Sequence, residues 1–187
     1  MKTKKKCFMI VLILALFAGI SFGQEKIKFP FTGKVTGDNV NVRSGPDINY
    51  YSTVRLMKGN LVEVAGQEYN WYKIVPPEGS FSWVAKSCVE KVGKNKGVIS
   101  RDRVAIRAGS KFTSRKTAIQ MIAKKGLEIE ILGDDGEYYK ITPPQGAYLW
   151  ISVDYVKPVV EKQLSKVKVK REDVPEIVEA VATSSAP

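Results

Sequence analysis

The chain has 187 residues, 30 lysines and arginines against 19 acidic residues, and no histidine. This length allows one ordinary domain or two small ones, and the lack of histidine excludes a Cys–His or Ser–His nucleophile pair as well as the commonest metal ligand. The formal net charge of +11 favours anionic partners in a salt-dependent manner, although an ordinary solubilising surface explains it equally well.

Residues 1–23 have the three parts of a secretory signal peptide. A head with four lysines precedes an apolar run from Phe8 to Phe22, and Ser21-Phe22-Gly23 places small residues at both positions that determine cleavage. The run is shorter than the about 20 apolar residues that span a membrane, so we expect only transient membrane contact, with a retained anchor as the alternative. Removal of the four lysines leaves +7 of the +11. The protein is therefore expected to be exported, to the periplasm, the cell envelope or the extracellular space.

The rest of the chain contains one pattern twice. Residues 33–90 hold NVNVRSGP, a Lys-Gly turn, WYKIVPPEG and SWV, and residues 97–157 hold RVAIRAGS, a Lys-Gly turn, YYKITPPQG and LWI in the same order. The offset between the copies is 64 at Arg43 and Arg107 and 67 from the Lys-Gly turns onward, so a loop between these points gained three residues. Each copy has its own full set of apolar strands, unlike a solenoid repeat, and we predict two separate small domains.

Alternation of apolar and polar residues with a period of two predicts half-buried β-strands in both copies. Turn residues separate these strands, among them Pro76-Pro77-Glu78-Gly79 and Pro143-Pro144-Gln145-Gly146. About five short strands per copy without a helical period predict an all-β fold of two small barrels. The alternating apolar positions are Val40, Val42, Val62, Val64, Tyr72 and Ile74 in the first copy and Val104, Ile106, Ile129, Ile131, Tyr139 and Ile141 in the second.

The segment 158–187 differs in composition from the repeats. It is rich in Val, Lys and Glu and ends in small residues. Such a composition predicts a flexible tail with at most a short helix.

Cys88 is the one cysteine left after removal of the signal, so no intrachain disulfide can form. It lies in the apolar stretch that closes the first copy, where a buried and inert thiol is expected. A reactive thiol and intermolecular pairing are the alternatives.

The ordered motifs resemble those of the bacterial SH3-like (SH3b) family. They are the strand and turn Asn41–Pro46, the Lys-Gly turn and strand at Lys58–Val64, the strand Trp71–Ile74, and the closing pair Trp83-Val84. The Pro-Pro-x-Gly segment before the last Trp resembles a subgroup of the family. The second copy departs from the pattern at three positions, where Ala105, Ser110 and Tyr138 replace Asn41, Pro46 and Trp71.

The resemblance implies two SH3-like β-barrels in tandem, each compact, strongly bent and of about five strands. Family members are commonly non-catalytic targeting or binding modules of exported bacterial proteins, often for peptidoglycan and its peptides. We therefore expect a binding module for cell-wall peptidoglycan. The alternative is an adaptor or structural subunit that binds an envelope protein or peptide and does not bind wall glycan.

No catalytic, metal or cofactor site is expected. The carboxylates are scattered over strands and turns, one cysteine cannot make a thiolate metal site, and no Gly-rich loop lies between a strand and a helix. Basic charge with interleaved aromatic residues is compatible with nucleic-acid binding, but export argues against such a partner.

Aromatic residues are the candidate ligand-binding residues. Strand alternation places Trp71 on the face opposite Tyr72, and the second copy has no equivalent of the tyrosine pair in the loop after Gly45. We therefore expect the first copy to recognise the ligand and the second to support it. The alternative is that the Trp rings only cover the open side of each barrel. The candidates are Tyr50, Tyr51, Trp71, Trp83, Tyr138 and Trp150.

Arg43 recurs as Arg107 in the second copy. We expect both to form a salt bridge or hydrogen bonds to loop carbonyls instead of contacting a ligand.

Overall fold

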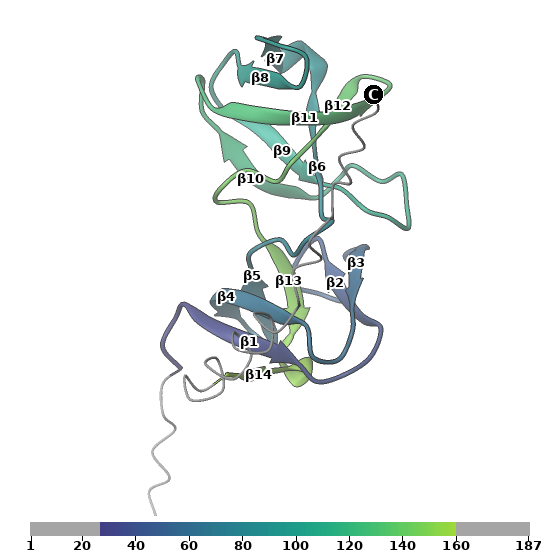
Figure 1. The fold of residues 1–187 in the computed structure, drawn as a ribbon, viewed down its shortest axis with the longest axis vertical. Helices are drawn as coiled ribbons and strands as arrows, with labels where there is room; N and C mark the ends of the chain where they lie inside the picture. The colour runs from purple at the N-terminus through teal and green to yellow at the C-terminus, as the bar shows by residue number, and fades with distance from the viewer. Residues whose placement is uncertain (1–26, 160–187) are drawn as a thin grey trace, which may run out of the picture.

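The computed structural model describes residues 27–159, which fold into two lobes stacked along one axis (Figure 1). The expected signal peptide, 1–23, and all but two residues of the expected tail, 158–187, lie outside the described residues. The regular structure within 27–159 consists of β-strands and two 3-10 turns, which confirms the all-β prediction. No helix in this range is long and apolar enough to cross a membrane.

The strands form two antiparallel seven-stranded sheets. The lower lobe of Figure 1, called barrel 1, has the order β14-β1-β4-β5-β13-β2-β3, and the upper lobe, called barrel 2, has the order β10-β9-β6-β12-β11-β8-β7. Barrel 1 contains β1 (Phe31–Val35), β2 (Val40–Arg43), β3 (Ser52–Leu56), β4 (Leu61–Glu68), β5 (Trp71–Ile74), β13 (Leu149–Ser152) and β14 (Val156–Pro158). Barrel 2 contains β6 (Ser82–Ala85), β7 (Val89–Lys91), β8 (Lys96–Ile99), β9 (Val104–Ala108), β10 (Ile119–Ala123), β11 (Glu128–Asp135) and β12 (Tyr138–Ile141). The 3-10 turns η2 (Lys86–Cys88) and η3 (Val153–Tyr155) precede β7 and β14.

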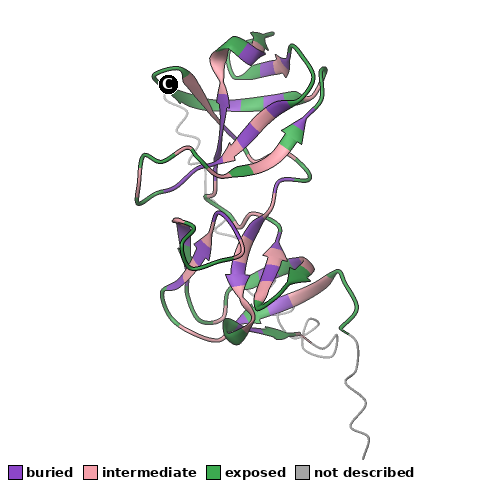
Figure 2. Ribbon diagram, turned by 180° about the vertical axis from the view of Figure 1, so that it is seen from behind, coloured by how far each residue is buried: buried purple, intermediate pink, exposed green. Residues whose placement is uncertain are grey.

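Each barrel closes around a cluster of aliphatic side chains, with Ala108 of β9 packed into the cluster of barrel 1, and buried and exposed positions alternate along the strands (Figure 2). Eleven of the twelve predicted inward positions are buried, and the exception, Tyr139, is half-buried. Val42, Val64 and Ile74 have no exposed surface in barrel 1, and neither have Ile106 and Ile141 in barrel 2. The period-two pattern therefore identified the faces of the strands correctly.

Strands β4 and β11 are the longest strands, and each pairs with one neighbour along its first half and with another along its second half. β4 pairs with β1 up to Val64 and then with β5, with a register shift between Val64 and Gly66. β11 has the equivalent shift between Ile131 and Gly133. Because a bulge bends a strand and increases its twist, these two strands curve each sheet toward closure.

The closing strand of each repeat lies in the barrel of the other repeat. β13, from the second repeat, pairs with β5 and β2, so that Trp150 is opposite Lys73 and Arg43. β6, from the first repeat, pairs with β12 and β9, so that Trp83 is opposite Lys140. Barrel 2 is thus one continuous segment, 82–141, inserted between β5 and β13 of barrel 1. The expected boundaries 33–90 and 97–157 follow the repeats and not the sheets.

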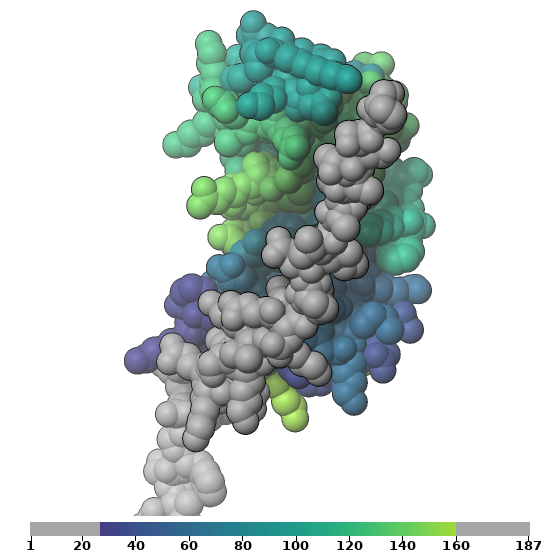
Figure 3. Space-filling model, in the orientation of Figure 1, coloured from purple at the N-terminus to yellow at the C-terminus, as the bar shows by residue number. Residues whose placement is uncertain are grey.

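The Pro-Pro segments connect the two barrels. The predicted turns are present, since Ser80 N donates to Pro77 O at 3.1 Å and Ala147 N donates to Pro144 O at 3.0 Å. However, neither turn joins a hairpin, because the strands on its two sides lie in different sheets. Proline lacks an N–H and has a fixed φ, so these segments cannot continue a ladder. The two segments lie side by side and line one cleft. In Figure 3 the later part of the described chain, in light green, lies at the junction between the lobes.

The loop 109–118 of the second repeat contacts the edge strand β3 of barrel 1. Ser110 Oγ donates to Ser52 O at 2.7 Å, and Lys111 N donates to Thr53 O at 2.9 Å. Ser110 Oγ also accepts from the backbone N–H groups of Phe112 and Thr113 at 2.9 and 3.2 Å. The serine that replaces the proline of the family motif therefore orders this loop and connects it to barrel 1.

Cys88 is a buried free thiol, as expected. The side chain of Arg101 lies next to it, with Nη2 at 2.8 Å from Sγ. The first two residues of the expected tail contact barrel 1, because Pro158 is opposite Gly33 of β1 and Val159 N donates to Thr32 O at 2.8 Å.

The strand exchange predicts which fragments fold. A fragment of residues 80–142 contains all seven strands of barrel 2 and is expected to show a β-sheet circular dichroism spectrum and a cooperative thermal transition. A fragment of residues 27–91, the complete first repeat, lacks β13 and β14 and is expected to remain largely unfolded, since β5 and β2 lose their shared partner. A folded first repeat together with an unfolded 80–142 fragment would contradict the exchange.

Replacing Ser110 by alanine tests the contact between the loop and barrel 1. The substitution leaves one carbonyl and two N–H groups without their partner, so we expect a loss of about 1–3 kcal/mol in the free energy of unfolding. Urea denaturation of the full chain measures it. Ser114→Ala, at an exposed position of the same loop, is the control and is expected to change stability by less than about 0.5 kcal/mol. Equal effects of the two substitutions would show that Ser110 does not connect the barrels.

Candidate functional site

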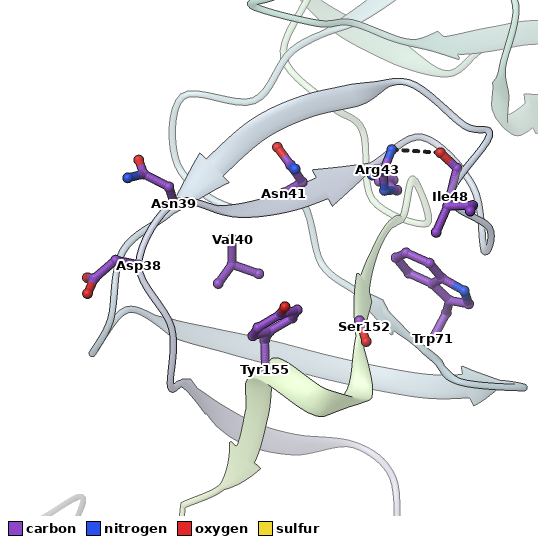
Figure 4. Close-up of a pocket in the computed structure, with 9 residues that line it drawn as sticks. All are labelled: Asp38, Asn39, Val40, Asn41, Arg43, Ile48, Trp71, Ser152 and Tyr155. Carbon is purple, nitrogen blue, oxygen red and sulfur yellow. Dashed lines mark hydrogen bonds between the residues drawn. The ribbon is translucent and has the colours of Figure 1, made fainter.

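A groove of about 340 Å³ crosses the face of barrel 1 where the turn between β1 and β2 meets β5, β13 and η3 (Figure 4). Asp38 and Asn39 lie at one end and Trp71 at the other, with Tyr155 and Ser152 between them. Ser152 and Tyr155 belong to the second repeat, so the strand exchange completes the groove. The lining residues are Asp38, Asn39, Val40, Asn41, Arg43, Ile48, Trp71, Ser152 and Tyr155.

Arg43 holds the loop that borders the groove. Its Nη1 donates to Ile48 O at 3.0 Å and to Tyr50 O at 2.7 Å. In barrel 2, Arg107 Nη1 donates in the same way to Thr117 O at 3.0 Å. The expectation that the recurring arginines bond to loop carbonyls is thus confirmed. In barrel 1 this contact brings the exposed side chain of Ile48 beside the Trp71 indole (Figure 4).

The polar groups of the groove are oriented by local hydrogen bonds. Asn39 has a left-handed backbone (φ 54°), which asparagine adopts more readily than most residues. Asn41 Oδ1 accepts from Ser52 Oγ at 3.0 Å and from Arg55 Nε at 3.1 Å. Within residues 27–159 its amide nitrogen has no hydrogen-bond partner, which leaves this donor for a ligand.

The strand exchange regroups the four predicted residues that lie on strands. Trp71 and Trp150, from different repeats, are both half-buried on the outer face of barrel 1, where β5 and β13 are neighbours. Trp83 and Tyr138 are neighbours on β6 and β12 of barrel 2. Trp83 is buried and packs edge-on against Phe81 with ring centroids 5.3 Å apart. Trp71 is the one predicted residue that lines the groove.

The two predicted loop tyrosines do not line the groove. The Tyr50 ring lies against Gly45, where a Cβ would collide with it. Tyr51 is half-buried, and its hydroxyl donates to Ala108 O of barrel 2 at 2.8 Å. Burial raises the pKa of Tyr51, so the hydroxyl keeps its proton at neutral pH. Tyr51 therefore connects the barrels, and its contact within the protein is structural.

Eight of the nine lining residues were not ligand-binding candidates in the sequence, and five of these eight had no role assigned there. Asp38 and Asn39 form a turn before β2, which their residue types indicate, but a turn alone does not indicate a binding site. Ile48 lies in the loop that Arg43 holds in place. Ser152 and Tyr155 are far from the groove in the chain, and only the exchanged pairing of β13 brings them to it.

The equivalent positions of barrel 2 lack several groove groups. At the offsets of the repeats, Ala105 replaces Asn41, Ala85 replaces Ser152, and the buried Cys88 replaces Tyr155. The amide, the hydroxyl and the exposed ring of barrel 1 are therefore missing from barrel 2, and the two barrels present different surfaces.

The groove contains neither a Ser–His pair nor a group of metal-binding side chains among the described residues. Ser152 Oγ donates to Asp154 Oδ2 at 3.1 Å, and the chain has no histidine that could serve as its general base. Within residues 27–159 no three His, Cys, Asp or Glu side chains are grouped so that they could hold a metal ion. The groove instead combines an indole, a phenol ring, an amide and two opposite charges, which can bind a polar ligand with a flat or apolar part.

Comparison with known proteins identifies a bacterial SH3 domain in this region. Residues 38–90 match the family described as "Bacterial SH3 domain". The matched segment includes most of the groove residues, and it also includes β6 and β7, which lie in barrel 2.

One relative has a name that refers to cell-wall chemistry. The chain is 26% identical over 133 residues to "Putative N-acetylmuramoyl-L-alanine amidase YrvJ" of Bacillus subtilis (strain 168). The alignment covers 65% of this chain and 24% of the relative, so the chain spans about a quarter of that protein. No solved structure matches the chain.

Arg43→Met tests how the groove loop is held, because methionine keeps the aliphatic stem and removes the donors. We expect amide hydrogen exchange at residues 47–50 to accelerate by about tenfold, which corresponds to the loss of about 1.4 kcal/mol of local hydrogen bonding. Arg107→Met is the matched control and is expected to accelerate exchange only around Thr117. If residues 47–50 exchange at the wild-type rate in Arg43→Met, the guanidinium does not fix this loop.

Proposed function

We propose that the protein is an exported, non-catalytic module that binds the bacterial cell wall through the groove of barrel 1, with a peptide of peptidoglycan as its ligand. The observation that carries this proposal is the open groove, with Trp71 at one end, on a segment that matches the bacterial SH3 domain. The relative named as an amidase of the muramoyl–alanine bond supports a link to the wall. The signal-like sequence of residues 1–23 supports export.

The shape and chemistry of the groove suit a short stretch of extended peptide. Its volume of about 340 Å³ is at the small end of ligand pockets. Trp71 offers a flat apolar surface with few rotatable bonds, while Asn41 and Ser152 can exchange hydrogen bonds with peptide groups. Asp38 and Arg43 place opposite charges in the groove, which complements a peptide that carries both amino and carboxyl groups.

A binding role without catalysis agrees with the composition of the site. Hydrolysis of a wall amide by a Ser or Cys nucleophile needs a neighbouring base, and the chain contains no histidine. The amidase activity implied by the relative's name concerns a protein of which this chain covers 24%. The bacterial SH3 segment is the part for which we propose the binding role.

We assign recognition to barrel 1 and a supporting role to barrel 2. Barrel 1 has the groove, with Trp71 at its end. Barrel 2 has alanine and a buried cysteine at the equivalent positions of Ser152 and Tyr155. Barrel 2 also supplies the loop 109–118 that supports β3.

Sedimentation with purified insoluble peptidoglycan tests the proposal. The protein from residue 24 onward is expected to be depleted from solution, and Trp71→Ala is expected to weaken binding by about tenfold or more, as for an aromatic residue that anchors a ligand. Tyr155→Ala, at an exposed position of the groove, should also weaken binding. Tyr138→Ala, at the position of barrel 2 equivalent to Trp71, is the matched control and is expected to bind normally. Circular dichroism checks that each variant is folded.

Two results would overturn the proposal. If peptidoglycan does not deplete the wild-type protein, the module does not bind the wall and the alternative of an envelope adaptor is favoured. If Trp71→Ala and Tyr155→Ala bind as tightly as Tyr138→Ala, the wall is bound elsewhere on the protein.

A further inference from the structure

An internal lysine lies on an aromatic and acidic face of barrel 2. Lys116 Nζ lies 4.5 Å from the centre of the Trp83 ring and 5.6 Å from that of Tyr138. It also forms an ion pair with Asp135 Oδ2 at 2.6 Å, and its side chain is only 17% exposed. Ring faces together with a carboxylate attract ammonium groups. Barrel 2 therefore contains an ammonium site that its own chain fills.

Barrel 1 has the same three positions in the same strand register. Tyr138 lies between Asp135 on β11 and Ala85 on β6, two residues along from Trp83. Trp71 lies in the same way between Glu68 on β4 and Ser152 on β13, two residues along from Trp150. Glu68, Trp71 and Trp150 are thus the counterparts of Asp135, Tyr138 and Trp83.

The other cations around these faces are matched between the barrels. Lys73 lies over the Tyr148 ring at 4.2 Å, and its counterpart Lys140 lies over the Phe81 ring at 4.1 Å. The arginines opposite Trp150 and Trp83 both bond to loop carbonyls. Because these lysines and arginines are matched between the barrels, they cannot explain a difference in ammonium binding between barrel 1 and barrel 2. The difference lies in Lys116.

The length of one loop explains why only barrel 2 is filled. The offset between the repeats is 64 at Val40 and Val104 but 67 at their strand partners Leu56 and Ala123. The three extra residues therefore lie in the loop between β9 and β10, which carries Lys116. In barrel 1, within the range 27–159, no lysine or arginine lies over the ring of Trp71 or Trp150, and Glu68 is in no ion pair.

We propose that Glu68, Trp71 and Trp150 form a binding site for a primary ammonium group, and that Lys116 occupies the equivalent site of barrel 2 as an internal ligand. Trp71 also ends the groove, so the site continues the groove across the sheet. For the source of the amine the inference rests on the proposed function: the ligand is the free side-chain amine of a diamino acid in a wall peptide. Cation–π contact with two indoles and the charge of Glu68 supply the attraction.

Titration with a small amine tests the site directly. The probe is Nα-acetyl-lysine methylamide, with its Nε-acetylated form as the control, and the readout is the three indole N–H signals of the chain in NMR spectra. We expect the free amine to shift the signals of Trp71 and Trp150 in a saturable way and the acetylated probe to act at least about fivefold more weakly. The signal of Trp83 should not respond. Glu68→Gln, at an exposed position, should weaken the response by about threefold or more. Equal responses to the two probes would refute the site.

Lys116→Ala empties the equivalent site of barrel 2, because it removes both the ammonium group and the stem that covers the rings. In this variant the free amine is expected to shift the Trp83 signal as well, with the responses of Trp71 and Trp150 unchanged. If Trp83 stays insensitive although the variant is folded, Lys116 does not act as an internal ligand, and the assignment of the barrel 1 site from it fails.

Acetylated peptidoglycan separates this inference from the proposed function. If the native wall binds and acetylation of its free amines abolishes binding, both hold. If wall binding depends on Trp71 but survives acetylation, the wall assignment stands and the amine site is refuted as the mode of recognition. If no wall binds but the small amine still shifts Trp71 and Trp150, the ammonium site stands and the wall assignment falls.

Discussion

Barrel 1 depends on the antiparallel pairing of β13 with β5 and β2, which joins strands of two different repeats. The pairing places Leu149 and Ile151 in the core of barrel 1, where they are 1% and 0% exposed. Val156 of β14 joins the same core. Without this pairing, the neighbouring edges of β5 and β2 would be unsatisfied, and buried backbone groups without partners are costly. The two repeats are therefore one structural unit although each has the complete motif of a small domain.

The nested order of the sheets has consequences for folding. Barrel 2 is continuous in the chain, so its contacts form over shorter sequence separations than those between β5 and β13. Because loop closure costs entropy, contacts over short separations form sooner on average. We infer that barrel 2 folds first and brings β13 toward β5 through the second Pro-Pro segment. The hydrogen bonds from Ser110 and Tyr51 then connect the two barrels.

Sequence patterns predicted the local structure well and the connection of the strands poorly. Alternation identified eleven buried positions, because the face of a strand depends on a period that the residues show directly. The closing strands Ser82–Ala85 and Leu149–Ser152 have similar patterns, so no local signal in the sequence reveals which barrel each strand joins. Ser152 and Tyr155 were missed for this reason. Nothing in the sequence distinguishes Lys116 from the other basic residues, because its position over Trp83 depends on the path of a loop.

The departures of the second repeat from the family motif can be understood as one change of role. Ser110 in place of proline allows the loop to bond to β3, and the three-residue insertion lets the same loop carry Lys116 onto Trp83. The first change supports β3 of barrel 1. The second change covers the aromatic face of barrel 2, whose counterpart in barrel 1 stays open. Under the proposed function, a loop that supports the neighbouring barrel and fills its own aromatic face leaves one recognition face per chain. The two repeats thus form an asymmetric pair, in which the second repeat also contributes Trp150, Ser152 and Tyr155 to the face of the first.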